Sequence, residues 1–112
     1  MWRGRISAQD GSASGGVGLG NMYYVYIIYS SVLHKKYIGR TDDLKLRLAK
    51  HNSGATQFTR AGKPWRLLYY ESFVNKNDAI AEELFLKSGK GRERLKFFLK
   101  NTMDDIFRGE VA

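Results

Sequence analysis

Two tyrosine-containing triplets are the part of this sequence whose residue types most suggest chemistry. Tyr24-Val25-Tyr26 lies in an aromatic, β-branched run, and Tyr37-Ile38-Gly39 follows a short polar stretch. Alternate side chains of a strand share a face, so a hairpin register that places Tyr26 beside Tyr37 would point two phenols at one region. A glycine after a strand tyrosine permits close approach of a backbone or of a ligand phosphate. Tyrosine is also a favoured strand residue, so the pair taken alone is more typical of a core role.

A second candidate pair is Arg47 and His51. They are four residues apart in an expected helix and therefore lie on one face of it. Arginine suits bidentate contact with phosphate, and histidine can transfer a proton near neutral pH. Together they favour phosphodiester chemistry, although such a pair also occurs on ordinary exposed helix faces.

The third candidate is the carboxylate of Glu83. On a helical wheel Glu83 falls inside an apolar arc, whereas Glu82 falls outside it; the arc comprises Ala79, Ile80, Leu84 and Leu86. A carboxylate on a core-facing stripe is costly unless a cation or hydrogen-bond donors satisfy it. A neighbouring Lys or Arg could supply that charge, and so could Mg²⁺.

The charge of the chain is strongly positive, with 19 Lys and Arg against 11 Asp and Glu. Residues 22–103 carry 16 basic and 7 acidic side chains, so the excess belongs to the expected folded region. Such a field attracts polyanions, nucleic acid before anionic membrane, although a solvated basic surface is the simpler alternative. There is no Cys, P-loop, zinc-type cluster or serine or cysteine triad, and no apolar run long enough to span a membrane.

The periodicity of apolar residues and the positions of turn-forming and capping residues predict the elements that would position these side chains. Strands are expected over 22–29, 36–40 and 65–74, the first two as an antiparallel hairpin. A helix of about ten residues is expected after Thr41 as N-cap, with Asp42 and Asp43 in its first turn. Further helices are expected over 75–88 and 91–100. The predicted fold class is α/β (α+β), with a three-stranded antiparallel sheet flanked by helices in the order β-β-α-β-α-α.

The predicted domain organisation is a single domain over 22–100. Residues 1–21 are rich in glycine and lack an apolar period, which predicts a disordered leader or tag-like segment. Residues 101–112 are expected to be a C-terminal tail. The lack of cysteine is consistent with a reducing compartment, and we expect a cytoplasmic protein with no membrane association.

Several ordered motifs resemble those of the GIY-YIG nuclease superfamily. The similarity is to its small stand-alone bacterial members, which are related to the N-terminal catalytic domain of the excision-repair nuclease C subunit. The first signature corresponds to Tyr24-Val25-Tyr26 and the second to Tyr37-Ile38-Gly39. The segment 43–48 (DLKLRL), the segment 51–54 (HNSG), Pro64-Trp65 and the spacing of Ala79, Glu83 and Lys87 also fit.

This resemblance implies an endonuclease that uses one divalent metal, Mg²⁺ or Mn²⁺, and acts on DNA, in repair or recombination. By match, Glu83 would be the metal ligand and Arg47 would hold the scissile phosphate. Tyr26 and Tyr37 would position or deprotonate the attacking water, and His51 would accept a proton. Arg40 would be a further phosphate contact.

Four more basic residues are predicted to contact nucleic acid: Lys45, Arg60, Lys63 and Lys87. Two other functions stay open on the sequence. One is a non-catalytic nucleic-acid-binding module on the same scaffold, favoured by the basic charge and the aromatic content. The other is a basic adaptor that docks on a protein through its sheet.

Overall fold

A computed structural model describes residues 3–4 and 21–111. Its strands are β1 (Arg3–Gly4), β2 (Tyr23–Ser30), β3 (Lys35–Thr41) and β4 (Trp65–Phe73). Its helices are α2 (Leu44–Ser53), the 3-10 turn η1 (Arg60–Gly62), α3 (Lys76–Leu86), α4 (Gly89–Phe98) and α5 (Lys100–Val111). Among the described residues, no helix is long and apolar enough to cross a membrane.

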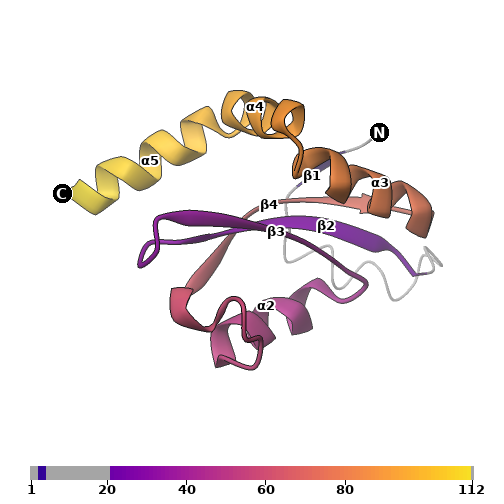
Figure 1. Ribbon diagram of the computed structural model, residues 1–112, viewed down its shortest axis with the longest axis horizontal. Coiled ribbons are helices and arrows are strands. Elements are labelled where there is room, and N and C mark those ends of the chain that lie inside the picture. The colour runs from indigo at the N-terminus through magenta and orange to yellow at the C-terminus, as the bar shows by residue number, and fades with distance from the viewer. Residues whose placement is uncertain (1–2, 5–20, 112) are drawn as a thin grey trace.

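The sheet lies between two helical layers (Figure 1), with α2 on one face and α3, α4 and α5 on the other. The strict alternation of β2 explains both layers. Val25 and Ile27 pack into the cluster formed with α3 and α4, whereas Tyr26 and Ile28 pack towards α2 and Trp65. All four side chains are buried because β2 is a central strand covered on both faces.

The antiparallel sheet of β2, β3 and β4 confirms the predicted fold class. The strand order is β1-β4-β2-β3, so within the described residues β3 is an outer strand with one unpaired edge. Tyr26 is paired with Gly39 and Ile28 with Tyr37, so the two tyrosines of the motif are diagonal neighbours rather than directly opposed. Their rings still meet, with centroids 6.5 Å apart.

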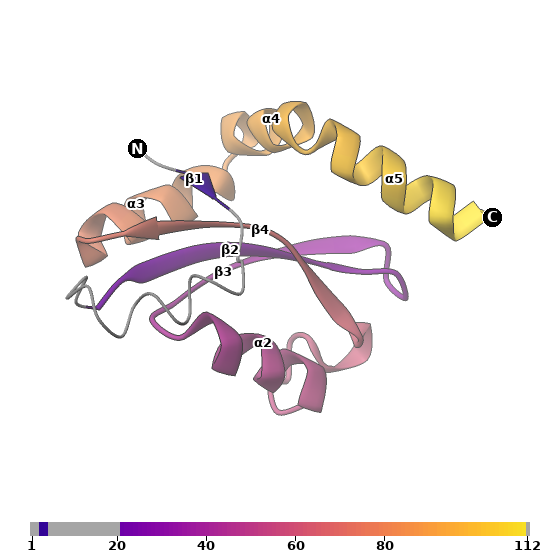
Figure 2. The same cartoon turned by 180° about the vertical axis from the view of Figure 1, so that it is seen from behind.

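The N-terminal segment differs from prediction at two residues. Arg3–Gly4 forms the short strand β1, which pairs antiparallel with β4 at Glu71 and Tyr70 (Figure 2). The outer edge of β4 offers unpaired backbone groups, which any extended peptide can satisfy. Residues 1–2 and 5–20 of the predicted leader lie outside the described residues.

The start of α2 also differs from prediction. The N-cap is Asp43, whose side chain accepts a hydrogen bond from the Leu46 amide, and no acidic residue lies in the first turn. Thr41 instead accepts a bond from the Asp43 amide and belongs to the end of β3. Asp and Thr are both good caps, so sequence alone placed the helix start two residues early.

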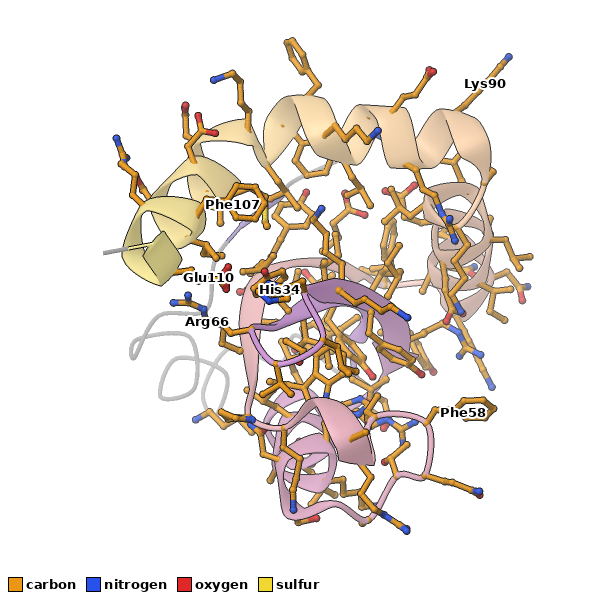
Figure 3. The ribbon with its side chains drawn as sticks, turned by 60° about the vertical axis from the view of Figure 1, so that its left-hand side comes forward. His34, Phe58, Arg66, Lys90, Phe107 and Glu110 are labelled. Carbon is orange, nitrogen blue, oxygen red and sulfur yellow. The ribbon has the colours of Figure 1, made fainter. Side chains whose placement is uncertain are left out.

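The C-terminal region is more ordered than a tail. The predicted third helix is α4, which ends at Phe98, and a further helix α5 follows from Lys100. Leu99, Met103 and Ile106 recur at helical spacing and are at least partly buried, which explains why α5 forms. Near its end, Glu110 accepts a hydrogen bond from Tyr29 at 3.2 Å and lies 3.6 Å from His34 in the β2–β3 turn (Figure 3).

Candidate active site

The two motif strands approach each other closely where Tyr26 packs on Gly39. A Cβ atom added to Gly39 would lie 2.4 Å from the Tyr26 hydroxyl oxygen, because the Tyr26 ring rests directly on the Gly39 backbone. The sequence predicted that this glycine would admit a backbone or a ligand. The group that it admits is the phenol of the other motif, which fixes where the Tyr26 hydroxyl lies.

A chain of hydrogen bonds starts at that hydroxyl. Tyr26 Oη lies 2.8 Å from His51 Nε2, and His51 Nδ1 lies 2.7 Å from Thr59 Oγ1. The Thr59 hydroxyl donates in turn to the carbonyl of Thr56, so its oxygen is left to accept the proton on Nδ1. His51 Nε2 is then the acceptor for the Tyr26 hydroxyl. With the Thr59 hydroxyl donating to Thr56 at 3.5 Å, His51 is the tautomer that can take a proton from Tyr26.

Arg47 completes the chain from the solvent side. Its Nε donates to Tyr26 Oη at 3.4 Å. Arg47 is partly exposed, whereas Tyr26 and His51 are fully buried. Nε is used inside the protein, and Tyr37 is a further hydrogen-bond partner of the guanidinium. The remaining N–H groups can bind an anion.

Tyr37 packs against the same histidine. Its ring centroid lies 5.2 Å from that of His51 and 6.3 Å from that of Trp65. Tyr37 is partly exposed, so its phenol, unlike that of Tyr26, can reach solvent. The structure thus brings Tyr26, Tyr37, Arg47 and His51 together on the α2 face of the sheet.

The end of α2 is fixed to the start of β4. The side chain of Asn52 bonds both backbone groups of Trp65, accepting from its amide at 2.5 Å and donating to its carbonyl at 2.9 Å. The Trp65 indole donates to the carbonyl of Thr59 at 2.6 Å. These bonds hold the loop after α2 so that Thr59 stays on His51.

In this hydrogen-bonded chain, Arg47 is charged, whereas Tyr26 and His51 are neutral. Burial raises the pKa of the Tyr26 phenol, and the hydrogen bond from Arg47 lowers it by less. Burial, followed by the positive charge of Arg47, lowers the pKa of His51. The hydrogen bond with Tyr26 raises the pKa of Arg47. The neutral phenol is therefore the resting state of Tyr26, even with Arg47 beside it.

Glu83 lies on the other side of the outer strand β3 from the hydrogen-bonded chain of Arg47, Tyr26 and His51. It projects from α3, with Oε1 3.4 Å from Arg40 Nε and Oε2 3.1 Å from Lys87 Nζ. Its side chain is 18% exposed. It is close enough for its charge to be one of the smaller causes, after burial, that raise the pKa of Tyr26. The cation expected for Glu83 is thus supplied by two basic side chains.

The apolar stripe used to single out Glu83 is rotated in the structure. Ala79 and Leu86 are buried, but Leu84 is 65% exposed. Glu82, which the wheel placed outside the stripe, has a side chain only 10% exposed and lies 4.0 Å from Arg94 Nη1. The wheel's arc extended to Leu84 at one end, a residue that α3 turns towards solvent, so it left out Glu82 beyond the other end.

A divalent metal at this site would have one protein ligand. Among the described residues, no three His, Cys, Asp or Glu side chains lie close enough to bind a metal together. A single carboxylate suits Mg²⁺, which keeps several waters and takes further oxygens from a substrate phosphate. Glu83 fits that donor set once Arg40 and Lys87 leave its oxygens.

The other basic residues predicted to bind nucleic acid are dispersed. Arg40 is only partly exposed and faces Glu83. Lys45 is exposed on α2, and Lys63 is exposed before Pro64. The Arg60 Nε donates to the carbonyl of Gly54. Their contacts with nucleic acid stay a prediction.

Comparison with known proteins identifies the family. Residues 22–101 match the model of the GIY-YIG catalytic domain. The chain belongs to the GIY-YIG family. This is a nuclease superfamily, and the resemblance noted in the motifs is confirmed.

GIY-YIG relatives of similar size cover most of the domain. A UPF0213 protein in the ldhD 5'region of Pediococcus acidilactici is 42% identical over 84 residues, which are 72% of this chain and 85% of the relative. A UPF0213 protein of Lacticaseibacillus paracasei is 38% identical over 80 residues, 70% of this chain and 88% of the relative. No solved structure matches the chain significantly.

Thr59 is the site residue that sequence reasoning missed. It lies eight positions after His51 in a loop and shares no helical or strand period with it. Only the fold of that loop, fixed by Asn52 and Trp65, brings the two together. A threonine in a polar loop gives no signal of this role.

Proposed function

We propose that this GIY-YIG domain is a divalent-metal-dependent endonuclease that hydrolyses phosphodiester bonds in DNA, in the cytoplasm and in repair or recombination. The observation that carries the proposal is the hydrogen-bonded chain from Arg47 through Tyr26 and His51 to Thr59, with Glu83 across one strand. A purely structural tyrosine pair would not need a buried histidine held in one tautomer.

Arg47 binds the scissile phosphate in this proposal. Tyr26 holds Nε, so the guanidinium presents its terminal nitrogens to the phosphate oxygens in a fixed orientation. Charge that develops on those oxygens in the transition state is stabilised by a donor that needs no reorganisation. Tyr26 is in this respect a positioning residue for Arg47.

Proton transfer is assigned to the two tyrosines and His51. The exposed phenol of Tyr37 positions the attacking water, whose oxygen bonds to phosphorus as the bond to the leaving oxygen breaks. The proton released by the attacking water passes through the Tyr37 hydroxyl to Tyr26, as Tyr26 gives its own proton to His51, and the leaving oxygen takes a proton from solvent. His51 can accept that proton because burial lowers its pKa and keeps it neutral at rest.

Glu83 is assigned to the metal. A divalent cation bound there would add positive charge beside the reacting phosphate. Arg40 and Lys87 now contact the two carboxylate oxygens of Glu83. The phosphates of an arriving nucleic acid attract both basic side chains, which frees these oxygens to bind the metal.

Cleavage of a panel of structured DNAs and RNAs, with and without Mg²⁺ or Mn²⁺, tests the proposal. We expect Glu83→Ala to abolish cleavage while nucleic-acid binding persists, and Arg47→Ala to lose turnover without losing its thermal unfolding transition. Metal-dependent cleavage retained by Glu83→Ala would contradict the single-carboxylate assignment. A collapsed melt for Arg47→Ala would make Arg47 structural instead.

The second candidate is a non-catalytic nucleic-acid-binding module. It is favoured by the ion pairs that already satisfy Glu83. Salt-sensitive binding without metal-dependent cleavage by the wild-type protein would favour this module over the nuclease.

A further inference from the structure

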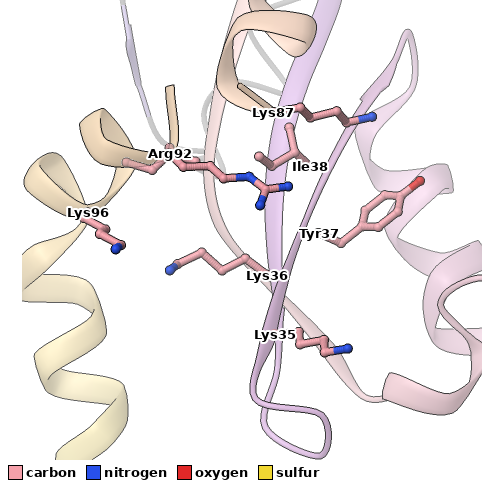
Figure 4. Close-up of a pocket in the computed structure, with 8 residues that line it drawn as sticks. Lys35, Lys36, Tyr37, Ile38, Lys87, Arg92 and Lys96 are labelled. Carbon is pink, nitrogen blue, oxygen red and sulfur yellow. The ribbon is translucent and has the colours of Figure 1, made fainter. Parts of the chain in front are cut away.

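A cleft of about 630 Å³ lies between the outer strand β3 and helix α4. Ile38 and Leu95 contribute its apolar lining, and five basic residues line it as well: Lys35, Lys36, Lys87, Arg92 and Lys96. Lys36 extends from β3 towards α4, and Arg92 extends from α4 back towards β3 (Figure 4). No acidic side chain is among its lining residues.

The positive charge of this cleft is poorly compensated. Of its basic residues, Lys87 alone has an ion pair within the described part of the chain, with Glu83. Burial, followed by the charge of Lys96, lowers the pKa of Lys36. Cations gathered without counter-charges repel one another, so the cleft is ready for an anion.

Protection of the sheet edge is the simplest other explanation for these lysines. Charged residues on an outer strand prevent pairing with another chain, and Lys35 and Lys36 could serve that purpose alone. That explanation does not extend to Arg92 and Lys96, which come from a separate helix. Their spacing on α4 places both on the side facing β3.

We infer that the β3–α4 cleft is a second anion site, which binds backbone phosphates of the nucleic acid strand beyond the scissile bond. This inference rests on the proposed function. Two residues join the cleft to the candidate active site: Tyr37, which lies in the strand that borders the cleft and whose ring points away from α4 towards His51 (Figure 4), and Lys87, which pairs with Glu83. A strand bound at Arg47 can therefore cross the edge of β3 and continue into the cleft.

Equilibrium binding of a short fluorescent DNA, as single strand and as duplex, tests the inference in the absence of divalent metal. The cleft variant combines Lys36→Gln, Arg92→Gln and Lys96→Gln. The control variant combines Lys50→Gln, Lys76→Gln and Lys90→Gln, which remove the same charge from exposed positions outside the cleft. Circular dichroism melts verify that both variants are folded.

We expect the cleft variant to bind roughly a hundredfold more weakly near physiological salt, with the slope of log K against log salt smaller by about 2 to 3. The control should lose less than one unit of slope. Equal losses in the two variants would overturn the cleft while leaving the proposed function intact. If the wild-type protein binds no DNA at low salt, the proposed function fails first and the cleft fails with it.

A second measurement does not depend on affinity. The chain contains no cysteine, so Lys96→Cys and Lys50→Cys each introduce one labelling position. Each is modified with a photoreactive maleimide and irradiated with bound DNA. Cross-linking at position 96 several-fold above that at position 50 is the expected result; equal yields would overturn the cleft assignment.

Discussion

The two sides of strand β3 hold polar groups in contrasting ways. On the α2 side, Tyr26, His51 and Thr59 are fully buried and joined by hydrogen bonds of 2.7 to 2.8 Å. On the α3 side, Glu83 is partly exposed and held by ion pairs with Arg40 and Lys87 at 3.4 and 3.1 Å. One side is built of neutral groups with fixed partners, and the other of charges that can exchange partners.

This difference indicates how the work of the site is divided. A buried hydrogen-bond chain is costly to disturb, because each unsatisfied group keeps its full desolvation penalty. A partly exposed ion pair contributes little to stability and can be replaced by ligand contacts. The α2 side therefore sets geometry, and the α3 side accepts ligands.

The largest expected effect is from His51→Ala. It removes a fully buried ring and leaves the Tyr26 and Thr59 hydroxyls without their partner, so we expect a loss of roughly 3–5 kcal/mol in the free energy of unfolding. Urea unfolding measures it. His34→Ala, at the chain's other histidine, is the control and should change stability little. Similar midpoints for both variants would contradict the rigid α2 side.

Gly39→Ala should have the next largest effect. Its Cβ would collide with the Tyr26 hydroxyl, so the phenol must leave His51 and Arg47, at a cost of about 1–3 kcal/mol. Cleavage should fall with it. Gly109→Ala, which meets no atom within 4 Å, should instead stabilise α5 by up to about 1 kcal/mol. Unchanged stability in Gly39→Ala would show that Tyr26 can move freely.

Glu83→Ala should change the free energy of unfolding by less than about 1 kcal/mol, because its ion pairs are partly exposed. Thermal and urea unfolding at matched salt test this expectation. A loss as large as that of His51→Ala would remove the contrast between the two sides.

The smallest effect needs only a change of pH. Burial and Arg47 place the pKa of folded His51 below the ordinary value of about 6.5, so the unfolded chain binds the proton first. Stability should therefore decline as pH falls below about 6.5. His51→Gln should lack this part of the decline, as measured by urea midpoints across that range. Parallel pH profiles would indicate that His51 does not titrate differently on folding.

Much of this molecule was predictable from sequence because its signals are local. The aromatic, β-branched run of residues 22–29 predicts a central strand, and the four-residue spacing of Arg47 and His51 predicts a shared helix face. Both are present. The short link between the first two strands predicts their antiparallel hairpin, which is also present.

The features that the sequence did not predict depend on contacts between distant segments. Thr59 reaches His51 only because Asn52 and Trp65 close the intervening loop. Pairing of Arg40 with Glu83 depends on how α3 is rotated over β3, and the helical wheel misjudged that rotation by counting Leu84 as core-facing. The helix α5 did carry a readable signal, since Leu99, Met103 and Ile106 have helical spacing.

Because only one strand separates Glu83 from Tyr26, the absorbance of the Tyr26 phenol can report binding at Glu83. After burial, the negative charge of Glu83 is among the causes that raise the pKa of the Tyr26 phenol. A cation that binds Glu83 in place of Arg40 and Lys87 would change this contribution, which is the smallest of the causes acting on the pKa of Tyr26. Ultraviolet absorbance of tyrosinate, compared between wild type and Tyr26→Phe, would then register ligand arrival at the carboxylate even when no bond is cleaved.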